Sequence, residues 1–262
     1  MSPLEVRILG PLTVSCDGRE AAPSTPKPRQ VLALLAARCG QPVHVDVLIE
    51  ELWVNAPPNR AQTVLQNCVM LLRRSLAAAL ERSTDEVARD VLPFDGWGYR
   101  LAAEPDSCDA GRFMHLAGQG RTALLAGDST EAALVLRRAL RLWRGPALAD
   151  VTAGPCLRGH RAWLEEARIG VLEQRVEADL RLGRHHDLIA ELPGVLARHP
   201  LHENLYSLFL ISLFRAGQPA QALDAFEYLR RNLRDELGID PSPRVSRLHQ
   251  EILQAPHPVR VS

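Results

Sequence analysis

Several clusters of side chains in this sequence have the residue types that acid-base catalysis or metal binding would need. Glu165 and Glu166 are adjacent carboxylates, and histidines occur in pairs at His185–His186 and at His199/His202. Successive residues of a helix point about 100° apart, so the two glutamates would not share a pocket. The histidines have no cysteine or carboxylate partner at a known ligand spacing, which is typical of exposed histidines at helix ends. We therefore predict neither a catalytic carboxylate pair nor a metal site.

Motifs for nucleotide binding and nucleophilic catalysis are not found either. The sole lysine, Lys27, lies between two prolines, so the sequence has no phosphate-binding loop that ends in Gly-Lys. The glycines of "AGQGRTALLAGD" (117–128) follow a helical pattern, whereas a dinucleotide-binding fingerprint needs a strand, a turn and a helix in that order. No Gly-x-Ser-x-Gly motif occurs. The sequence predicts a protein that is not an enzyme and uses no cofactor.

The stretch "AQTVLQNCVMLLRRSL" (61–76) has the residue pattern of a different kind of site. At helical spacing one face is apolar and consists of Ala61, Leu65, Cys68, Leu72 and Leu76. The opposite face carries Arg60, Thr63, Asn67, Met70 and Arg74. No Asp or Glu occurs from Leu52 to Leu80, so this helix presents a polar face without acids, as a helix that approaches DNA phosphates should.

The elements around this helix would place it in a winged helix. The sequence predicts a small sheet in residues 1–15 with a turn at "CDG", a helix in 26–40, a helix in 45–53 capped by Asp46, and the helix just described. Two short extended runs, 90–94 and 99–104, joined by the turn "DGWG", predict a hairpin. In a winged helix the third helix enters the major groove and the hairpin lies beside it as the wing.

This arrangement assigns DNA contacts to particular side chains. Gln66 and Asn67 can pair with adenine, and Arg73 and Arg74 near the helix end can bind phosphate. Lys27 and Arg29 flank the start of the first long helix, where either a phosphate clamp or simple helix capping would explain them. Arg100 lies in the expected wing. The predicted DNA-binding residues are Lys27, Arg29, Arg60, Thr63, Gln66, Asn67, Met70, Arg73, Arg74 and Arg100.

The second half of the sequence repeats one pattern, a helix end, a glycine and an amphipathic helix. Gly183 and Gly217 are 34 residues apart, the period of a tetratricopeptide repeat, and Gly127 belongs to a third copy. Gly238 is expected to end the last repeat in the left-handed conformation, followed by stops at Pro241 and Pro243. Such a helical solenoid leaves a concave surface that engages proteins or peptides.

Length and composition set the domain organisation. The 262 residues, with a net charge of zero, allow two domains: a winged helix in 1–103 and an all-α repeat domain in 104–255, followed by a disordered tail in 256–262. The fold class is mainly α with a small β component. Five widely spaced cysteines predict reduced thiols, and no membrane span or leader is expected, so we predict a cytoplasmic protein. The predicted DNA binding would associate it with the nucleoid.

Several long blocks of the sequence resemble one family of regulators. "LGPLTV", "KPRQVLALLAARCGQPVHVDVLIEELW", "LQNCVMLLRRSL" and "GYRL" are similar to the OmpR-type winged helix of the Streptomyces antibiotic regulatory proteins. "ALRLWRGPALADV", "WLEEARIGVLEQRVEADLRLGRHHDLIAELPGVLARHPLHENL" and "FRAGQPAQALDAFEYLRRNLRDELGIDPSPRVSRLHQEIL" resemble that family's bacterial transcriptional activation domain. The family usually has a further basic residue near position 71, where this chain has Met70-Leu71.

The resemblance implies a transcriptional activator of an antibiotic biosynthetic cluster. Its partners would be double-stranded DNA with tandem direct repeats, a second protomer on that DNA, and RNA polymerase including its sigma factor. Two alternatives stay open at this point. One is a repeat protein that senses ligands or binds proteins, with weak or no DNA binding, which the neutral charge and Met70-Leu71 would fit. The other is an enzyme of an unrecognised kind.

Overall fold

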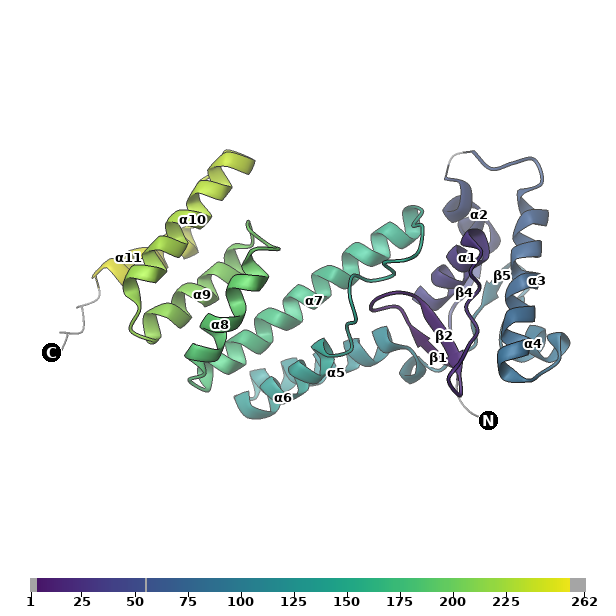
Figure 1. Cartoon of the computed structure of the whole chain (residues 1–262), viewed down its shortest axis with the longest axis horizontal. Coiled ribbons are helices and arrows are strands. Elements are labelled where there is room, and N and C mark those ends of the chain that lie inside the picture. Colours follow the sequence, from purple (N-terminus) through teal and green to yellow (C-terminus); the bar gives the residue numbers. More distant parts are fainter. Residues whose placement is uncertain (1–3, 55, 255–262) are drawn as a thin grey trace. The chain divides into compact units, whose positions relative to one another are not determined.

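The apolar periodicity of the sequence is matched by helices and short strands in the computed structural model, which describes residues 4–54 and 56–254 (Figure 1). The mainly α fold with a small β component is confirmed. The chain forms two compact units, Met1–Gly118 with Arg137–Ile169, and Gln119–Leu136 with Gly170–Ser262. The first unit thus draws residues from both sides of the predicted boundary at 103. The predicted tail, 256–262, lies outside the described residues.

The first unit begins with the small sheet that the N-terminal alternation predicts. Its strands β1, β2 and β3 pair antiparallel in that order, with Val6 opposite Val14 and both side chains fully buried. The "CDG" turn joins β2 and β3, and Asp17 and Gly18 take positive φ values of 49° and 76° there. The elements of the winged helix and its exit are β1 (Glu5–Arg7), β2 (Thr13–Cys16), β3 (Arg19–Glu20), α1 (Pro26–Ala37), β4 (Pro42–His44), α2 (Val45–Trp53), α3 (Ala61–Leu80), α4 (Thr84–Asp90), β5 (Gly98–Arg100) and the short helix η1 (Pro105–Ser107).

Helices α1, α2 and α3 contact one another and enclose the core of the winged helix (Figure 1). The predicted apolar stripe of α3 is confirmed, because its five members are buried: Ala61, Leu65, Cys68, Leu72 and Leu76. The α2 helix begins one residue before its expected cap. His44, not Asp46, is the N-cap, and its Nδ1 accepts a hydrogen bond of 3.1 Å from the Asp46 backbone N–H.

The segment after α3 differs from the predicted order of helix and hairpin. A further helix, α4, intervenes, and its start is fixed by a capping box in which Ser83 and Glu86 bind each other's backbone N–H groups. Strand β5 pairs with β4, and the run 90–94 also pairs with the run 99–104, through a bridge between Phe94 and Tyr99 and hydrogen bonds from the Arg100 and Ala102 N–H groups to the carbonyls of Pro93 and Val91. The predicted hairpin is therefore present as a short wing joined by backbone hydrogen bonds, and its second run pairs with β4 as well.

Two buried carboxylates connect the winged helix to the segment that follows it, within the first unit. Glu51 at the end of α2 is 1% exposed and accepts hydrogen bonds from the backbone N–H groups of Gly154, Cys156 and Leu157, at 2.6, 2.9 and 3.2 Å. It thereby caps α7 (Pro155–Arg181). Asp109 begins α5 (Asp109–Leu125) and accepts hydrogen bonds from the N–H groups of Ile8 and Leu9 at 2.8 and 3.0 Å.

A third carboxylate of the first unit, Asp150, supports a loop from the N-terminal sheet. It accepts a hydrogen bond of 2.7 Å from the Leu12 N–H and forms an ion pair with Arg29. Partial burial acts to raise the pKa of Asp150, but the Leu12 N–H and the Arg29 guanidinium outweigh it and hold the pKa below 3.8, its ordinary value. The folded state therefore binds fewer protons than the unfolded chain as the pH falls through this range.

Replacing Asp150 with asparagine is expected to reduce the loss of stability that occurs as the pH is lowered. The stabilisation that Asp150 gives is complete above its ordinary pKa of 3.8 and is lost as the pH falls through the lowered pKa. The measurement is the urea midpoint at pH 5 and at pH 3, where the drop should be smaller for Asp150→Asn than for the wild type. Asp224→Asn, at an exposed position, serves as the control. Equal drops in all three proteins would contradict the account.

The second unit consists of helical hairpins whose turns share one geometry. Gly127, Gly183 and Gly217 have φ values of 83°, 75° and 75°, in the left-handed region that favours glycine. After each glycine, the next residue's N–H binds the carbonyl five positions back: Asp128 to Ala123, Arg184 to Asp179 and Gln218 to Leu213. This is the Schellman motif, and it confirms the helix, glycine, helix pattern of the sequence. The second unit contains the C-terminal parts of α5 and α7 and most of α6 (Ser129–Leu140). It also contains α8 (His185–Leu196), α9 (Glu203–Arg215), α10 (Pro219–Leu237) and α11 (Pro243–Gln254).

The end of the repeat array follows the sequence only in part. Gly238 ends α10 in the left-handed conformation with φ 68°, as predicted. Pro243 is not a stop. It is the first residue of α11, whose buried Val245 and Ile252 lie on one side of that helix, and α11 contacts α9 and α10. Proline suits this position because the first N–H of a helix has no intrahelical partner.

Candidate nucleic-acid interface

The polar face of α3 is exposed along its length. Gln62, Thr63, Gln66, Asn67, Met70 and Arg74 are all exposed, and so is Arg60 at the N-cap. The nearest acid after the helix, Glu81, is ion-paired with Arg19. The face thus offers amide and hydroxyl groups between two arginines, without a competing negative charge from the helix itself.

The polar face of α3 is long enough to cross a DNA major groove and to reach the phosphates on both sides. At 1.5 Å per residue, Arg60 and Arg74 are separated by about 21 Å along the axis, whereas the groove is about 12 Å wide. Thr63, Gln66 and Asn67 lie between them. A helix inserted at its middle would therefore place the amides at the base edges and the arginines at the phosphates.

A hollow of about 220 Å³ lies between α3 and the wing. Gln62 and Gln66 of α3, Val45 of α2, and Phe94 and Tyr99 of the wing line it. The sequence prediction left out Gln62, although it is one helical turn from Gln66 on the same polar face and could have been found by that spacing. Because two amides border the hollow, Gln62 joins the candidate interface.

Arg73 is part of the structure of the wing. Its Nε and Nη2 atoms donate hydrogen bonds of 3.2 and 2.8 Å to the Leu92 carbonyl, and its guanidinium lies 5.9 Å from the centre of the Tyr99 ring. It therefore holds the segment after α4 against α3. Arg74, the next residue, is exposed. The sequence predicts the same role, phosphate binding, for both arginines, but the fold places them in different environments.

This difference predicts different outcomes for two matched substitutions. Arg73→Ala should lower the free energy of unfolding by about 1–2 kcal/mol, because the Leu92 carbonyl loses its hydrogen bonds from a charged donor. Arg74→Ala should leave stability within about 0.5 kcal/mol, weaken DNA binding for every sequence alike and reduce the salt slope by about one for each bound protomer. Urea unfolding and DNA titrations at several salt concentrations measure both. An equal loss of stability in the two variants would contradict the assignment.

The two cations at the start of α1 also differ from each other. Arg29 is engaged within the first unit, where it donates hydrogen bonds to the carbonyls of Pro23 and Leu12 and pairs with Asp150. Its donors are used by the fold, so we do not include it in the proposed interface. Lys27 is exposed, and its Nζ lies 4.6 Å from the centre of the Trp53 ring. A lysine held in this way keeps its charge at the surface.

The wing presents aromatic side chains rather than charge. Phe94 and Trp97 are 49% and 48% exposed, and the Trp97 ring stacks on His44 at 5.6 Å between ring centres. The Nε of Arg100 lies 3.2 Å from Asp95, so its charge is paired within the turn. Gly98 is required there, because a Cβ at this position would lie 2.3 Å from the Val43 carbonyl oxygen.

Two kinds of site are not found in the structure. Among residues 4–54 and 56–254, no group of three His, Cys, Asp or Glu side chains is placed to hold a metal ion. No helix in this part of the chain is both long and apolar enough to cross a membrane.

Comparison with known proteins gives a consistent result. Residues 108–253 match the family model described as bacterial transcriptional activator domain. The chain is 45% identical to "Regulatory protein DnrI" of Streptomyces peucetius over 96% of its own length and 93% of that protein. It is 36% identical to "Transcriptional regulator RedD" of Streptomyces coelicolor, over 95% of this chain and 70% of that protein.

A solved structure shows the same fold. "Mycobacterium tuberculosis EmbR in complex with low affinity phosphopeptide" superposes with a TM-score of 0.89 at 34% sequence identity, and the match covers 98% of this chain and 66% of that one. The winged helix, its exposed α3 face and the helical repeats define a transcriptional regulator. The chain belongs to the Streptomyces antibiotic regulatory protein family, and it carries that family's bacterial transcriptional activator domain.

Proposed function

We propose that this regulator activates transcription by binding tandem direct repeats near the promoters of a secondary-metabolite biosynthetic cluster. The observation that carries the proposal is the exposed, acid-free face of α3, on which amides stand between two arginines. Two protomers bind adjacent repeats, with their α3 helices in successive major grooves about 10 base pairs apart.

Each side chain of the interface has a defined role in this proposal. Gln66 and Asn67 read adenine through paired donor and acceptor groups, with Gln62 and Thr63 beside them. Arg60, Arg74 and Lys27 bind phosphate oxygens and set the orientation of the helix. Arg73 acts indirectly, because it fixes the wing against α3. Met70 supplies an apolar contact of the kind that the thymine methyl group accepts.

The activation step is a contact between proteins. The helical repeats are proposed to contact RNA polymerase with its sigma factor, and also the second protomer. Every additional 1.4 kcal/mol of contact between activator and polymerase raises promoter occupancy about tenfold where occupancy is limiting. This step needs no chemical reaction, in keeping with the regulatory role of the relatives.

Binding of the full chain to random duplexes tests the proposal. Repeated enrichment of bound duplexes should recover a direct repeat, and affinity for it should exceed that for random duplex by at least about 10³-fold. With about six phosphate contacts from two protomers, affinity should fall about 10³-fold between 50 and 200 mM salt. Recovery of no common sequence, together with a flat salt response, would contradict the proposal.

A second candidate function is a regulator that binds proteins or ligands and has weak or no DNA binding. The observation in its favour is the pair Met70 and Leu71. These side chains are 41% and 44% exposed on α3, where the family usually has a further basic residue. Exposed apolar residues on a helix can mark a protein contact. The salt dependence separates the two candidates, because a protein contact through this pair would not release counterions from DNA.

A further inference from the structure

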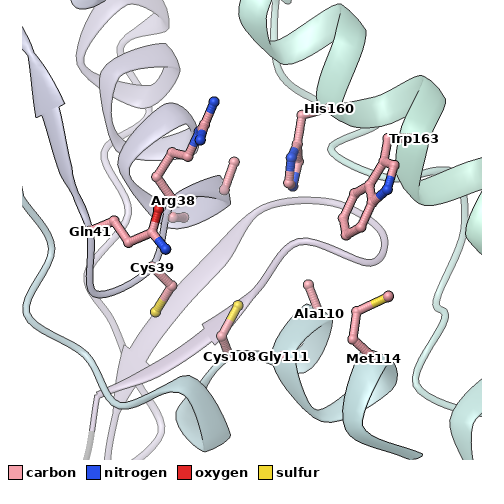
Figure 2. Close-up of a pocket in the computed structure, with 11 residues that line it drawn as sticks. Arg38, Cys39, Gln41, Cys108, Ala110, Gly111, Met114, His160 and Trp163 are labelled. Carbon is pink, nitrogen blue, oxygen red and sulfur yellow. The ribbon is translucent and has the colours of Figure 1, made fainter. Parts of the chain in front are cut away.

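A pocket of about 420 Å³ lies within the first unit, away from the exposed face of α3. Its walls come from the C-terminal end of α1 and the turn after it, the first turns of α5, and the N-terminal part of α7 (Figure 2). This volume falls in the lower part of the range of pockets that bind small organic ligands, about 300–1,000 Å³.

The shape of the pocket comes from small residues that face large ones. Ala36 and Ala37 of α1 and Ala110 and Gly111 of α5 leave the space open. In Figure 2 the rings of His160 and Trp163 point from α7 toward Ala110 and Met114 of α5. Trp163 and Met114 are 49% and 40% exposed, so the fold leaves two large apolar side chains uncovered at this opening. An aromatic ring and a thioether are good contacts for a flat aromatic ligand.

Two polar groups face the same space. The Nε2 atom of His160 is buried and has no hydrogen-bond partner within the described residues. Burial and the nearby charge of Arg38 lower the pKa of His160, so its ring is neutral at pH 7 and can donate or accept one hydrogen bond. Arg38 is exposed at the rim, and no carboxylate of the described chain forms an ion pair with it. An uncompensated cation at the mouth of an apolar pocket favours an anionic ligand group.

Gln41 and two cysteines complete the polar part of the pocket lining. Cys39 and Cys108 are free thiols that lie side by side in Figure 2, and the Cys39 Sγ donates a hydrogen bond of 3.7 Å to the Ala103 carbonyl oxygen. No third ligand completes a metal site among the described residues. The pair adds polarisable sulfur to the wall, which again suits an aromatic ring.

We propose that this pocket binds a small planar aromatic acid. The ring lies between Trp163 and Met114, an acceptor or donor of the ligand binds His160 Nε2, and the carboxylate pairs with Arg38 at the mouth. The ligand would touch α1 of the winged helix and α7, which Glu51 joins to α2. An effect of this ligand on DNA binding would rest on the proposed function, whereas the binding of the ligand to the pocket does not.

Calorimetric titration of the full chain with three probes tests the ligand class. The probes are 2-naphthoate, its neutral amide 2-naphthamide, and cyclohexanecarboxylate, which carries the charge without the aromatic ring. We expect one naphthoate per chain, with affinity about tenfold above that of the amide and at least tenfold above that of cyclohexanecarboxylate. Equal affinities for the three probes, or no saturable binding of naphthoate, would overturn the proposal.

Variants locate the binding and separate it from a loss of folding. Trp163→Leu should lower naphthoate affinity at least tenfold, whereas Trp97→Leu, which removes a tryptophan of equal exposure outside the pocket, should not change it. Arg38→Gln should remove the preference for the acid over the amide, and Arg74→Gln should keep it. Thermal unfolding of each variant checks the fold, and Arg38→Gln provides the decisive result should Trp163→Leu unfold. Unchanged selectivity in Arg38→Gln would overturn the assignment.

DNA binding of the same samples without ligand distinguishes this proposal from the proposed function. A wild-type chain that selects its direct repeat but does not bind naphthoate would overturn the pocket assignment alone. Naphthoate binding in a chain that fails to select a DNA sequence would support the pocket and contradict the DNA-binding role.

Discussion

Asn67→Asp is expected to lower the affinity for the selected direct repeat about 100-fold. The substitution changes few atoms, but it removes a donor and places a carboxylate on α3 where the proposal puts base edges and phosphates. Asn67 is exposed, and Asn and Asp have similar helix propensities, so stability should change by less than about 0.5 kcal/mol. Titration of labelled duplex at fixed salt measures the effect.

The control for this substitution carries the same change in charge elsewhere. Gln221→Glu lies at an exposed position in the first turn of α10, and it should bind the duplex within about twofold of the wild type. Equal losses in both variants would mean that net charge alone decides affinity. Full affinity in Asn67→Asp would remove this face of α3 from the interface.

Glu51→Ala should cause the largest loss of stability, about 3–4 kcal/mol. Its carboxylate accepts hydrogen bonds from three backbone N–H groups at the start of α7 and one from Gln30 at 3.3 Å; all are buried except that from Cys156, which is partly buried. Alanine would leave the donors buried without partners, which costs about 1–3 kcal/mol for each group that water cannot reach. Urea unfolding measures the shift of the transition.

The neighbouring residue supplies the comparison for Glu51. Glu50 is exposed on the same helix, and Glu50→Ala should change stability by no more than about 0.5 kcal/mol. Glu51→Gln should lie between the two, because an amide keeps one acceptor oxygen but turns its NH₂ toward N–H donors. A Glu51→Ala protein as stable as Glu50→Ala would show that water replaces the carboxylate, against the role assigned to it.

Local periodicity was sufficient to predict α3 and the repeat turns. The stripe from Ala61 to Leu76 is buried because a helix with one apolar face must cover it, whatever its neighbours are. Gly183 and Gly217 end their helices because glycine takes the left-handed conformation at little cost. These signals lie within a few residues of the structure that they specify.

The contacts that join distant segments could not be read in the same way. Glu51 and Asp109 accept hydrogen bonds from residues more than a hundred positions away, and an acid in an amphipathic helix looks like a surface charge until its partners are known. The pairing of β5 with β4, in addition to its contacts with residues 90–94, likewise depends on how α2 and α3 bring these strands together. The α4 helix was missed although Ser83 and Glu86 have the spacing of a capping box.

The same reason applies within the candidate interface. Arg73 and Arg74 are adjacent arginines in the sequence, and only the fold shows that Arg73 binds the Leu92 carbonyl while Arg74 is exposed. Arg29 is likewise engaged by Asp150, which is far from it in sequence. Side-chain type therefore supplies candidates for DNA contact, and tertiary contacts decide which of these side chains are available for it.

Methylation interference on the selected duplex tests most directly whether α3 lies in the major groove. Dimethyl sulfate methylates guanine at N7, which faces the major groove, and adenine at N3, which faces the minor groove. The account predicts that N7 methylation within each repeat blocks binding, at positions about 10 base pairs apart. Binding that is insensitive to N7 methylation and blocked only by methylation at adenine N3 would contradict it.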